Sequence, residues 1–486
     1  MPRVEIHTAT GAAPGTDPIG AIVVVRRIVA GVAPAASVVR PRGIGGRLGA
    51  LTPSGRARVT VSWSLYDFAN TVFSYAVVST AFGLYLTHPD RLGQGPGQLA
   101  QSLAVAISVA VNALVSPILG ALSDRGGRRL GFLLFFTILT IAPSTIIGFS
   151  PALVGAALFT IANFSYQAAL IYYDATLKTV SSPETRGRLS GIGTGIGYLG
   201  TITIGILLIV LAVPDDGIFL VAAVVFAFFA VPIFLFVKET GSGPPFNLSG
   251  AKADLLQIRS TIAHARTVPG LLRFLGGRFF YSDAVNTIIV VMSVVAVRAM
   301  GMTTQQFLLI SVLLTVVAVV ASFVWGGLVD RFGPKRTLLW VLASWAVGLV
   351  IGAASLGLAG TTLGNGLFVI AGAIIGSGLG GVQVADRVFM IRLSPPQRLG
   401  EFFGLYGLVG KGSQVIGQLM YGIIVFLLVD SVGNVAYQLA ILSLIVTMLI
   451  GYWLIRPVGD RWAGSGDVVA PPERLGPDRV PLQPRS

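Results

Sequence analysis

The sequence carries one motif twice, as Gly120-Ala-Leu-Ser-Asp124-Arg125-Gly-Gly127-Arg128-Arg129 and as Gly326-Gly-Leu-Val-Asp330-Arg331-Phe-Gly333-Pro-Lys335-Arg336. Each copy stands where a long apolar run ends and a basic loop begins. Internal similarity of this kind indicates a molecule built from two related halves. In a membrane protein, related halves are typical of transporters in which one half rocks against the other around a central site.

The composition indicates that lipid surrounds most of this chain. Hydrophobic residues make up 54% of its 486 residues and charged residues only 11%, whereas soluble proteins carry roughly 25% charge. Cysteine is absent and only three histidines occur, all outside the apolar runs, so we expect no metal site. We find no nucleotide-binding loop and no catalytic constellation, so we expect no cofactor and no enzyme activity.

Twelve apolar runs are long enough to cross a bilayer, which takes about 20 residues. They lie near residues 61–87, 98–121, 130–149, 152–175, 189–212, 217–237, 275–297, 305–328, 337–358, 366–390, 402–428 and 434–455. We therefore expect an all-α membrane protein with twelve transmembrane helices in two pseudo-symmetric six-helix bundles. The predicted parts are a disordered basic leader (1–60), a first bundle (61–237), a linker with a short interfacial helix (238–274), a second bundle (275–456) and a disordered tail (457–486).

The distribution of positive charge predicts the orientation. An even number of spans places both termini on one side of the membrane, and 30 of the 34 Lys and Arg residues fall on that side. Only Arg91 and Arg298 fall on the other side. The positive-inside rule then predicts cytoplasmic termini in the cell (inner) membrane. The net charge of +14 arises from these loops and gives no reason to expect nucleic acid. We expect a monomer whose partners are the lipid bilayer and a small-molecule substrate.

Six charged residues are assigned to the interior of the predicted spans, namely Asp67, Asp174, Asp283, Asp386, Arg387 and Lys411. Arg278, close to the start of the seventh run, is counted with the basic linker. A charge in hydrocarbon costs about 2.5–3.5 kcal/mol even on the insertion scale, so most of the six must face water or one another. Two interpretations compete: they line a central cavity, or they form ion pairs that lock the inner gate. We favour the cavity, with substrate or proton binding, for Asp67, Asp283 and Lys411. We favour a gate or packing role for Asp174, Asp386 and Arg387.

The repeat extends to polar residues within the spans. Asp67-Phe-Ala-Asn70-Thr71 matches Asp283-Ala-Val-Asn286-Thr287, and the spacing puts each Asp and Asn on one helix face. Asp67 or Asp283 is a candidate to bind and release a proton during transport. Acids together with Lys411 would suit a zwitterion, and Tyr66 and Tyr198 are candidates to line its path. Glycines 191, 193, 195 and 197 predict a thin helix at a close helix–helix interface.

The repeated loop motif is the second group of candidates. An Asp at this position can pair with an Arg or cap a neighbouring helix, where the helix dipole favours negative charge. Such a contact would form in one conformation and break in the other. The candidate gating residues are Gly120, Asp124, Arg125, Gly127, Arg128, Asp330, Arg331 and Gly333.

This motif, Gly-x-Leu-x-Asp-Arg-x-Gly with trailing basic residues, resembles the loop 2–3 motif of the major facilitator superfamily. Three further stretches resemble its vacuolar-effluxer-like branch, which includes autophagy-linked amino-acid exporters: Trp63-Ser-Leu-Tyr66-Asp67-Phe-Ala-Asn70, Pro183-Glu-Thr-Arg186-Gly187-Arg188 and Gly410-Lys411. One departure is Asp174, where the branch implies a neutral Asn. The resemblance implies amino-acid substrates. We therefore expect export of a small polar solute, such as an amino acid, by alternating access in exchange for protons. A drug or sugar exporter and a non-transporting receptor or scaffold are the alternatives.

Overall fold

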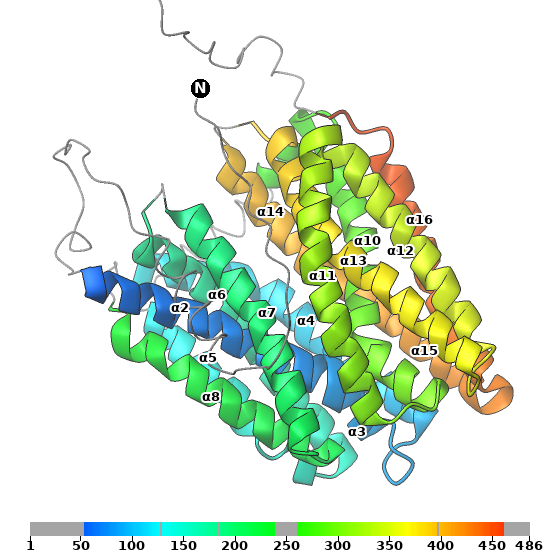
Figure 1. Cartoon of the computed structure of the whole chain (residues 1–486). Helices are drawn as coiled ribbons and strands as arrows, with labels where there is room; N and C mark the ends of the chain where they lie inside the picture. The colour runs from blue at the N-terminus through cyan, green and yellow to red at the C-terminus, as the bar shows by residue number, and fades with distance from the viewer. Residues whose placement is uncertain (1–52, 127–128, 183–184, 239–259, 396–397, 461–486) are drawn as a thin grey trace, which may run out of the picture. The chain divides into compact units, whose positions relative to one another are not determined.

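The computed structural model describes residues 53–126, 129–182, 185–238, 260–395 and 398–460. Over these residues the chain folds into helices, and twelve helical stretches are long and apolar enough to cross a membrane. This confirms the predicted all-α fold with twelve transmembrane helices, which we number as spans 1 to 12 in chain order. Figure 1 shows them coloured from blue for span 1 to orange-red for span 12.

The first half comprises spans 1 to 6. Span 1 consists of α2 (Pro53–Phe73), the π-helical segment η2 (Ser74–Ala81) and α3 (Phe82–Leu86). The next spans are α4 (Gln94–Gly126), α5 (Arg129–Ser144) with the turn η3 (Ile147–Phe149), α6 (Ala152–Val180), α7 (Arg186–Val210), and α8 (Ile218–Phe236) after the turn η4 (Asp215–Gly217).

The second half comprises spans 7 to 12. They are α10 (Leu271–Val294) with the π-helical η5 (Val295–Ala299), α11 (Thr304–Phe332), α12 (Pro334–Leu356), α13 (Thr362–Leu393), α14 (Leu399–Gly412) continued through η7 (Ser413–Val415) into α15 (Ile416–Val432), and α16 (Asn434–Ile455). The π-helical segments of spans 1 and 7 lie near corresponding places of the repeat. Such segments are rare in proteins overall, but they occur often at functional sites.

Local sequence signals explain where several helices begin and end. Thr303 and Gln306 form a capping box that starts α11, because each side chain bonds the other's backbone N–H. Gly333 ends α11 at a φ of +85°, a conformation that favours glycine, and Pro334 then occupies the first turn of α12. The second copy of the repeated motif is therefore a tight helix–helix turn.

Each half has its own apolar core. The first-half core includes Phe82 and Phe159, whose rings stack with centroids 3.5 Å apart. The second-half core includes Trp345, which is fully buried. Large apolar side chains also lie on the outside, for example Leu114 (75% exposed) and Phe323 (77% exposed). Such exposure is unfavourable in water and fits a lipid-facing surface.

The halves meet through pairs of helices that the repeat relates. α4 packs against α15, and α7 packs against α11, as Figure 1 also shows for the second pair. In a six-plus-six repeat, span 2 corresponds to span 8 and span 5 to span 11, so the same pseudo-symmetry relates these two contacts. α10 also packs against η2 and α3 of span 1. We call the end of the helices that carries Pro53 and Ile455 the basic end, and the opposite end the far end.

Two predicted boundaries need correction. α2 already begins at Pro53, so the last residues of the predicted leader are helical. Arg58 lies in its first turns, and a search for apolar residues therefore starts the span too late. α10 begins at Leu271, four residues before the predicted start at 275, so Arg278 lies well inside the span. Residues 260–267 are helical and overlap the last part of the interfacial helix expected at 251–265. The remaining leader, linker and tail predictions fall on residues 1–52, 239–259 and 461–486, outside the described part of the chain.

Candidate functional site

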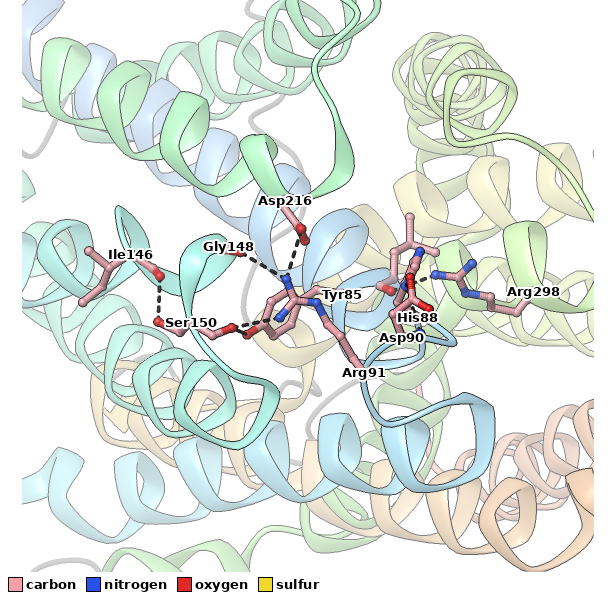
Figure 2. Close-up of polar contacts among 10 residues, drawn as sticks. Tyr85, His88, Asp90, Arg91, Ile146, Gly148, Ser150, Asp216 and Arg298 are labelled. Carbon is pink, nitrogen blue, oxygen red and sulfur yellow. Dashed lines mark hydrogen bonds and ion pairs between the residues drawn. The ribbon is translucent and has the colours of Figure 1, made fainter.

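Polar contacts join the two halves at the far end. Arg298 of η5 donates hydrogen bonds to the Leu84 carbonyl (2.9 Å) and to Thr87 Oγ1 (3.2 Å), both in the first half; Figure 2 shows this guanidinium. Nearby, Gln101 Nε2 donates to the Val290 carbonyl at 3.1 Å. These contacts join spans 1, 2 and 7 at the far end.

A second arginine holds together the far-end loops of the first half. Arg91 donates to the carbonyls of Ser150 (2.8 Å) and Gly148 (3.1 Å) and forms an ion pair with Asp216 at 3.0 Å (Figure 2). Its guanidinium lies 3.8 Å from the centre of the Tyr85 ring. The two arginines that the sequence assigns to this side are thus both engaged, Arg91 within one half and Arg298 between halves.

The central charged residues separate by half. Asp67 of α2 and Asp174 of α6 are acids of the first half, whereas Arg387 of α13 and Lys411 of α14 are bases of the second half. Asp174 is exposed, and its charge interacts with those of Lys411 and Arg387. Asp67 is half-buried and interacts with Asp174. We call Asp67 and Asp174 the acidic wall and Lys411 and Arg387 the basic wall. Asp174 lies within electrostatic reach of both bases, and Asp67 lies beside Asp174.

Close packing of α7 positions Asp67. A Cβ on Gly193 would lie 2.7 Å from the Trp63 ring and 3.3 Å from Asp67 Oδ2, so only glycine allows this approach. Thr71 Oγ1 donates to the Gly197 carbonyl at 2.6 Å. The predicted close interface is confirmed for Gly193 and Gly197, while nothing lies within 4 Å of a Cβ built on residues 191 and 195.

A cavity of about 310 Å³ lies between the halves, next to these residues. Its walls are mainly apolar, and Thr71 and Tyr198 line it on the first-half side. Tyr75 and Ser311 share a hydrogen bond of 2.5 Å across the halves, and Tyr198 donates to Gln383 Oε1 at 3.4 Å. Tyr198 thus lines the cavity, a position compatible with its predicted role. Tyr75 and Ser311 were not predicted, because no local pattern marks a polar residue whose partner lies in the other half.

Two first-half candidates lie away from the cavity. Tyr66 is fully buried, shares a hydrogen bond of 2.6 Å with Thr137 and stacks on Tyr173 at 5.1 Å between centroids. Asn70 is 2% exposed, and neither amide atom has a partner among the described residues. Both residues thus belong to the interior of the first half in this conformation, which corrects the expectation that Tyr66 lines the path.

Asp386 is held inside the second half. It forms an ion pair with Arg278 and accepts a hydrogen bond from the Tyr406 hydroxyl at 2.9 Å. The Arg278 guanidinium lies 3.5 Å from the centre of the Tyr406 ring. This arrangement fits the packing role proposed for Asp386. Arg278 was missed because it was counted with the linker, although it falls within the predicted span at 275–297.

The other matched acid, Asp283, is also buried. Its Oδ1 accepts the Gly417 backbone N–H at 2.8 Å, at the start of α15. Asn286 is half-buried on the same helix. The structure therefore separates the two repeated acids, since Asp67 faces the charged cluster and Asp283 faces the break between α14 and α15.

The repeated loop motif stays a predicted gate. Gly120, Asp124 and Arg125 lie in the last turns of α4, but their side chains, and the whole of Gly127 and Arg128, are outside the described part. Asp330 and Arg331 are exposed at the end of α11, before the Gly333 turn.

Comparison with known proteins identifies the family. Residues 178–459 match the family described as vacuole effluxer Atg22 like, and residues 64–285 match the Major Facilitator Superfamily. The chain belongs to the vacuole effluxer Atg22-like family. It is 28% identical over 414 residues to the uncharacterized MFS-type transporter YxiO of Bacillus subtilis (strain 168), covering 80% of this chain and 92% of that protein. It is 26% identical over 319 residues to Autophagy-related protein 22-1 of Penicillium rubens, covering 60% of this chain and 52% of that one.

Solved structures agree on the fold. A point mutant of the nucleoside transporter NupG superposes with a TM-score of 0.64 at 13% identity, covering 82% of this chain and 99% of that one. A D-xylose-proton symporter gives 0.63 at 13% identity, with coverages of 83% and 98%. These structures confirm the predicted fold. The family matches identify a multi-pass membrane transporter of the major facilitator superfamily and not an enzyme, which confirms the predicted superfamily and branch.

Proposed function

We propose that this transporter exports a zwitterionic solute of the amino-acid class by alternating access, in exchange for protons. The observation that carries the proposal is the pairing of an acidic first-half wall, Asp67 and Asp174, with a basic second-half wall, Lys411 and Arg387. The acids would bind the ammonium group, and Lys411 would bind the carboxylate. The family's description as a vacuole effluxer supports export and comes to this chain as part of the proposal.

The charge pattern favours a zwitterion over a solute with one charge. Charges away from bulk water are costly unless they are paired. A solute with only an ammonium would pair with the acidic wall and leave the basic wall without its present partners. A solute with only a carboxylate would pair with the basic wall and leave the acidic wall without its partners. A zwitterion replaces both sets of contacts at once. It would also draw the two halves together, which is the motion that alternating access requires.

The orientation of the transporter is part of this proposal. The positive-inside pattern supports a cytoplasmic basic end and cytoplasmic termini in the cell membrane. With the far end closed by Arg298 and Gln101, the structure then corresponds to a state that loads from the cytoplasm. Asp67 and Asp283 are the proposed proton carriers, and the first faces the substrate.

A drug or sugar exporter is the second candidate, because the walls of the cavity are mainly apolar. Thermal-shift assays on the purified protein separate the two candidates. Each amino acid would be tested alone, followed by the amine and the carboxylic acid that lack one charged group of any stabilising amino acid. A ligand at 100 times its Kd stabilises by about 2.7 kcal/mol. We expect stabilisation by intact amino acids and none by the two analogues.

Charge variants make the same assay specific to the site. Asp67→Asn and Lys411→Gln should each abolish the shift, whereas Asp430→Asn, an exposed acid of α15, should retain it. Stabilisation by sugars or drugs that survives Lys411→Gln would instead support the second candidate and refute the zwitterion site.

A further inference from the structure

Span 11 is broken directly after Lys411. α14 ends at Gly412, the chain forms one 3₁₀ turn over Ser413–Val415, and α15 begins at Ile416. Ser413 Oγ donates back to the Gly410 carbonyl at 3.0 Å. A 3₁₀ stretch within a long helix often marks a functional hinge. Any change in this break therefore alters how Lys411 faces Asp174 of the acidic wall.

Asp283 anchors the far side of the break. Its carboxylate is 1% exposed, and its Oδ1 accepts the Gly417 N–H at 2.8 Å. This N–H belongs to the first turn of α15, whose amide groups have no partners within the helix. A negative charge at that position is favourable because of the helix dipole. The bond thus ties α15 to span 7 six residues after Lys411.

The second carboxylate oxygen is unsatisfied. Asp283 Oδ2 and Thr287 Oγ1 are buried and have no hydrogen-bond partner among the described residues. A Cβ on Gly417 would lie 2.6 Å from Oδ2 and 2.7 Å from Oγ1, so both oxygens converge on the same face of Gly417. A buried carboxylate oxygen without a donor is costly. A proton on Oδ2 would neutralise the charge and lower that cost.

The repeat shows that this arrangement is specific to the second half. Thr71, the residue that matches Thr287, is satisfied because it donates to the Gly197 carbonyl at 2.6 Å. Asp67, the match of Asp283, is half-buried beside the charged cluster. Only the second-half copy combines full burial, an unsatisfied carboxylate oxygen and a bond to a helix break, among the described residues.

Within the described part of the chain, the charged groups near α10 are committed to other partners. Arg278 on the same helix pairs with Asp386, and Lys411 on α14 interacts with Asp174. The Gly417 N–H is the hydrogen-bond donor to Asp283 within the described part of the chain.

Of the remaining titratable groups on α10 and on the elements packed against it, Arg273 of α10 and Asp430 of α15 are exposed and Tyr452 of α16 is half-buried. The others have the following partners. Arg298 of η5, Tyr85 of α3, Tyr75 of η2, Tyr437 of α16 and Glu401 of α14 bond to Leu84, Ser150, Ser311, Gln94 and His264, respectively. Tyr406 of α14 bonds to Asp386. Tyr281 of α10 and Tyr421 of α15 are buried phenols whose hydroxyls have no partner among the described residues.

We propose that Asp283 carries the coupled proton and controls the substrate site through the break in span 11. This inference rests on the proposed proton-coupled transport. As a carboxylate, Asp283 holds the first turn of α15 and keeps Lys411 facing Asp174. A proton taken from water onto Oδ2 neutralises the group, weakens its bond to Gly417 and lets the break relax, so that Lys411 releases the substrate carboxylate. Loss of the same proton to water on the other side restores the bond.

The transport test uses wild type, Asp283→Asn and the control Asp430→Asn in proteoliposomes. Asparagine keeps an oxygen for the Gly417 N–H but takes up no proton. We expect Asp283→Asn to lose accumulation of a labelled amino-acid mixture driven by a pH gradient, and to lose the pH dependence of counterflow. Asp430→Asn should keep both. Accumulation by Asp283→Asn under a pH gradient would overturn the proposal, and so would accumulation by wild type under a sodium gradient at equal pH.

A second measurement does not need a substrate. Hydrogen–deuterium exchange over residues 411–420, corrected for intrinsic rates, would be compared between low and high pH. We expect faster exchange at low pH in wild type and no such change in Asp283→Asn. Equal pH responses in the two proteins would refute the coupling role even if no amino acid is transported. A wild type that shows the exchange response but no amino-acid uptake would instead refute the proposed substrate class alone.

Discussion

Replacing Arg298 with alanine should open the far end. The guanidinium donates to the Leu84 carbonyl at 2.9 Å and to Thr87 Oγ1 at 3.2 Å, across the two halves. Hydrogen bonds that involve a charged group contribute about 1.5–3 kcal/mol. Because Arg298 is partly exposed, we take the lower value for the pair of bonds. At about 1.4 kcal/mol for each factor of ten, the closed-to-open ratio should fall about tenfold.

The absence of cysteine from the sequence gives this prediction a clean assay. Ser102 of α4 is fully buried and contacts Gly422 of α15, so it lies on the seam between the halves. A single Ser102→Cys substitution would report opening through its rate of reaction with a membrane-impermeant thiol reagent. We expect Arg298→Ala to raise this rate about tenfold, given the free-energy change above. Arg298→Lys, which keeps one donor, should give an intermediate rate.

Arg91→Ala is the matched control for Arg298→Ala. This substitution also removes one positive charge from the far end. The hydrogen bonds and the ion pair of Arg91, however, all lie within the first half. We expect Arg91→Ala to lower thermal stability without raising the labelling rate. An unchanged labelling rate in Arg298→Ala, or an equal increase in Arg91→Ala, would refute the conclusion that Arg298 keeps the far end closed.

Two further predictions concern packing. A Cβ on Gly200 would lie 2.6 Å from the Phe68 carbonyl, so Gly200→Ala should destabilise the protein by about 1–3 kcal/mol, whereas Gly195→Ala should not lower the melting temperature; equal melting temperatures of the two variants would contradict this packing. Arg278→Ala leaves Asp386 buried and unpaired and should cost about 3–5 kcal/mol in thermal unfolding, and a loss below about 1 kcal/mol would show that the pair is not formed in solution.

The fold could be predicted because its signals are local and repeated. Each apolar run by itself predicts one span. The two copies of the loop motif, at Asp124 and Asp330, indicate the symmetry that relates the spans of the two halves. The predicted start of the first span is too late because Arg58 interrupts the apolar pattern, although the helix continues through Arg58.

The site could be predicted only in part, because each residue's role depends on neighbours distant in sequence. Tyr66 and Asp67 are adjacent, so on a helix they point about 100° apart, and one enters the core while the other faces the charged cluster. The sequence does not report which neighbour each face meets. For the same reason it could not reveal that Arg278 pairs with Asp386, or that Arg298 bridges the halves.

The central claim is that a zwitterion binds between the acidic and the basic wall. Counterflow uptake of a labelled amino-acid mixture into proteoliposomes tests it most directly, with wild type beside Asp67→Asn. The account predicts saturable uptake by wild type that unlabelled amino acids inhibit and that Asp67→Asn strongly reduces. Absence of uptake by folded wild type, or equal uptake by the two proteins, would contradict it.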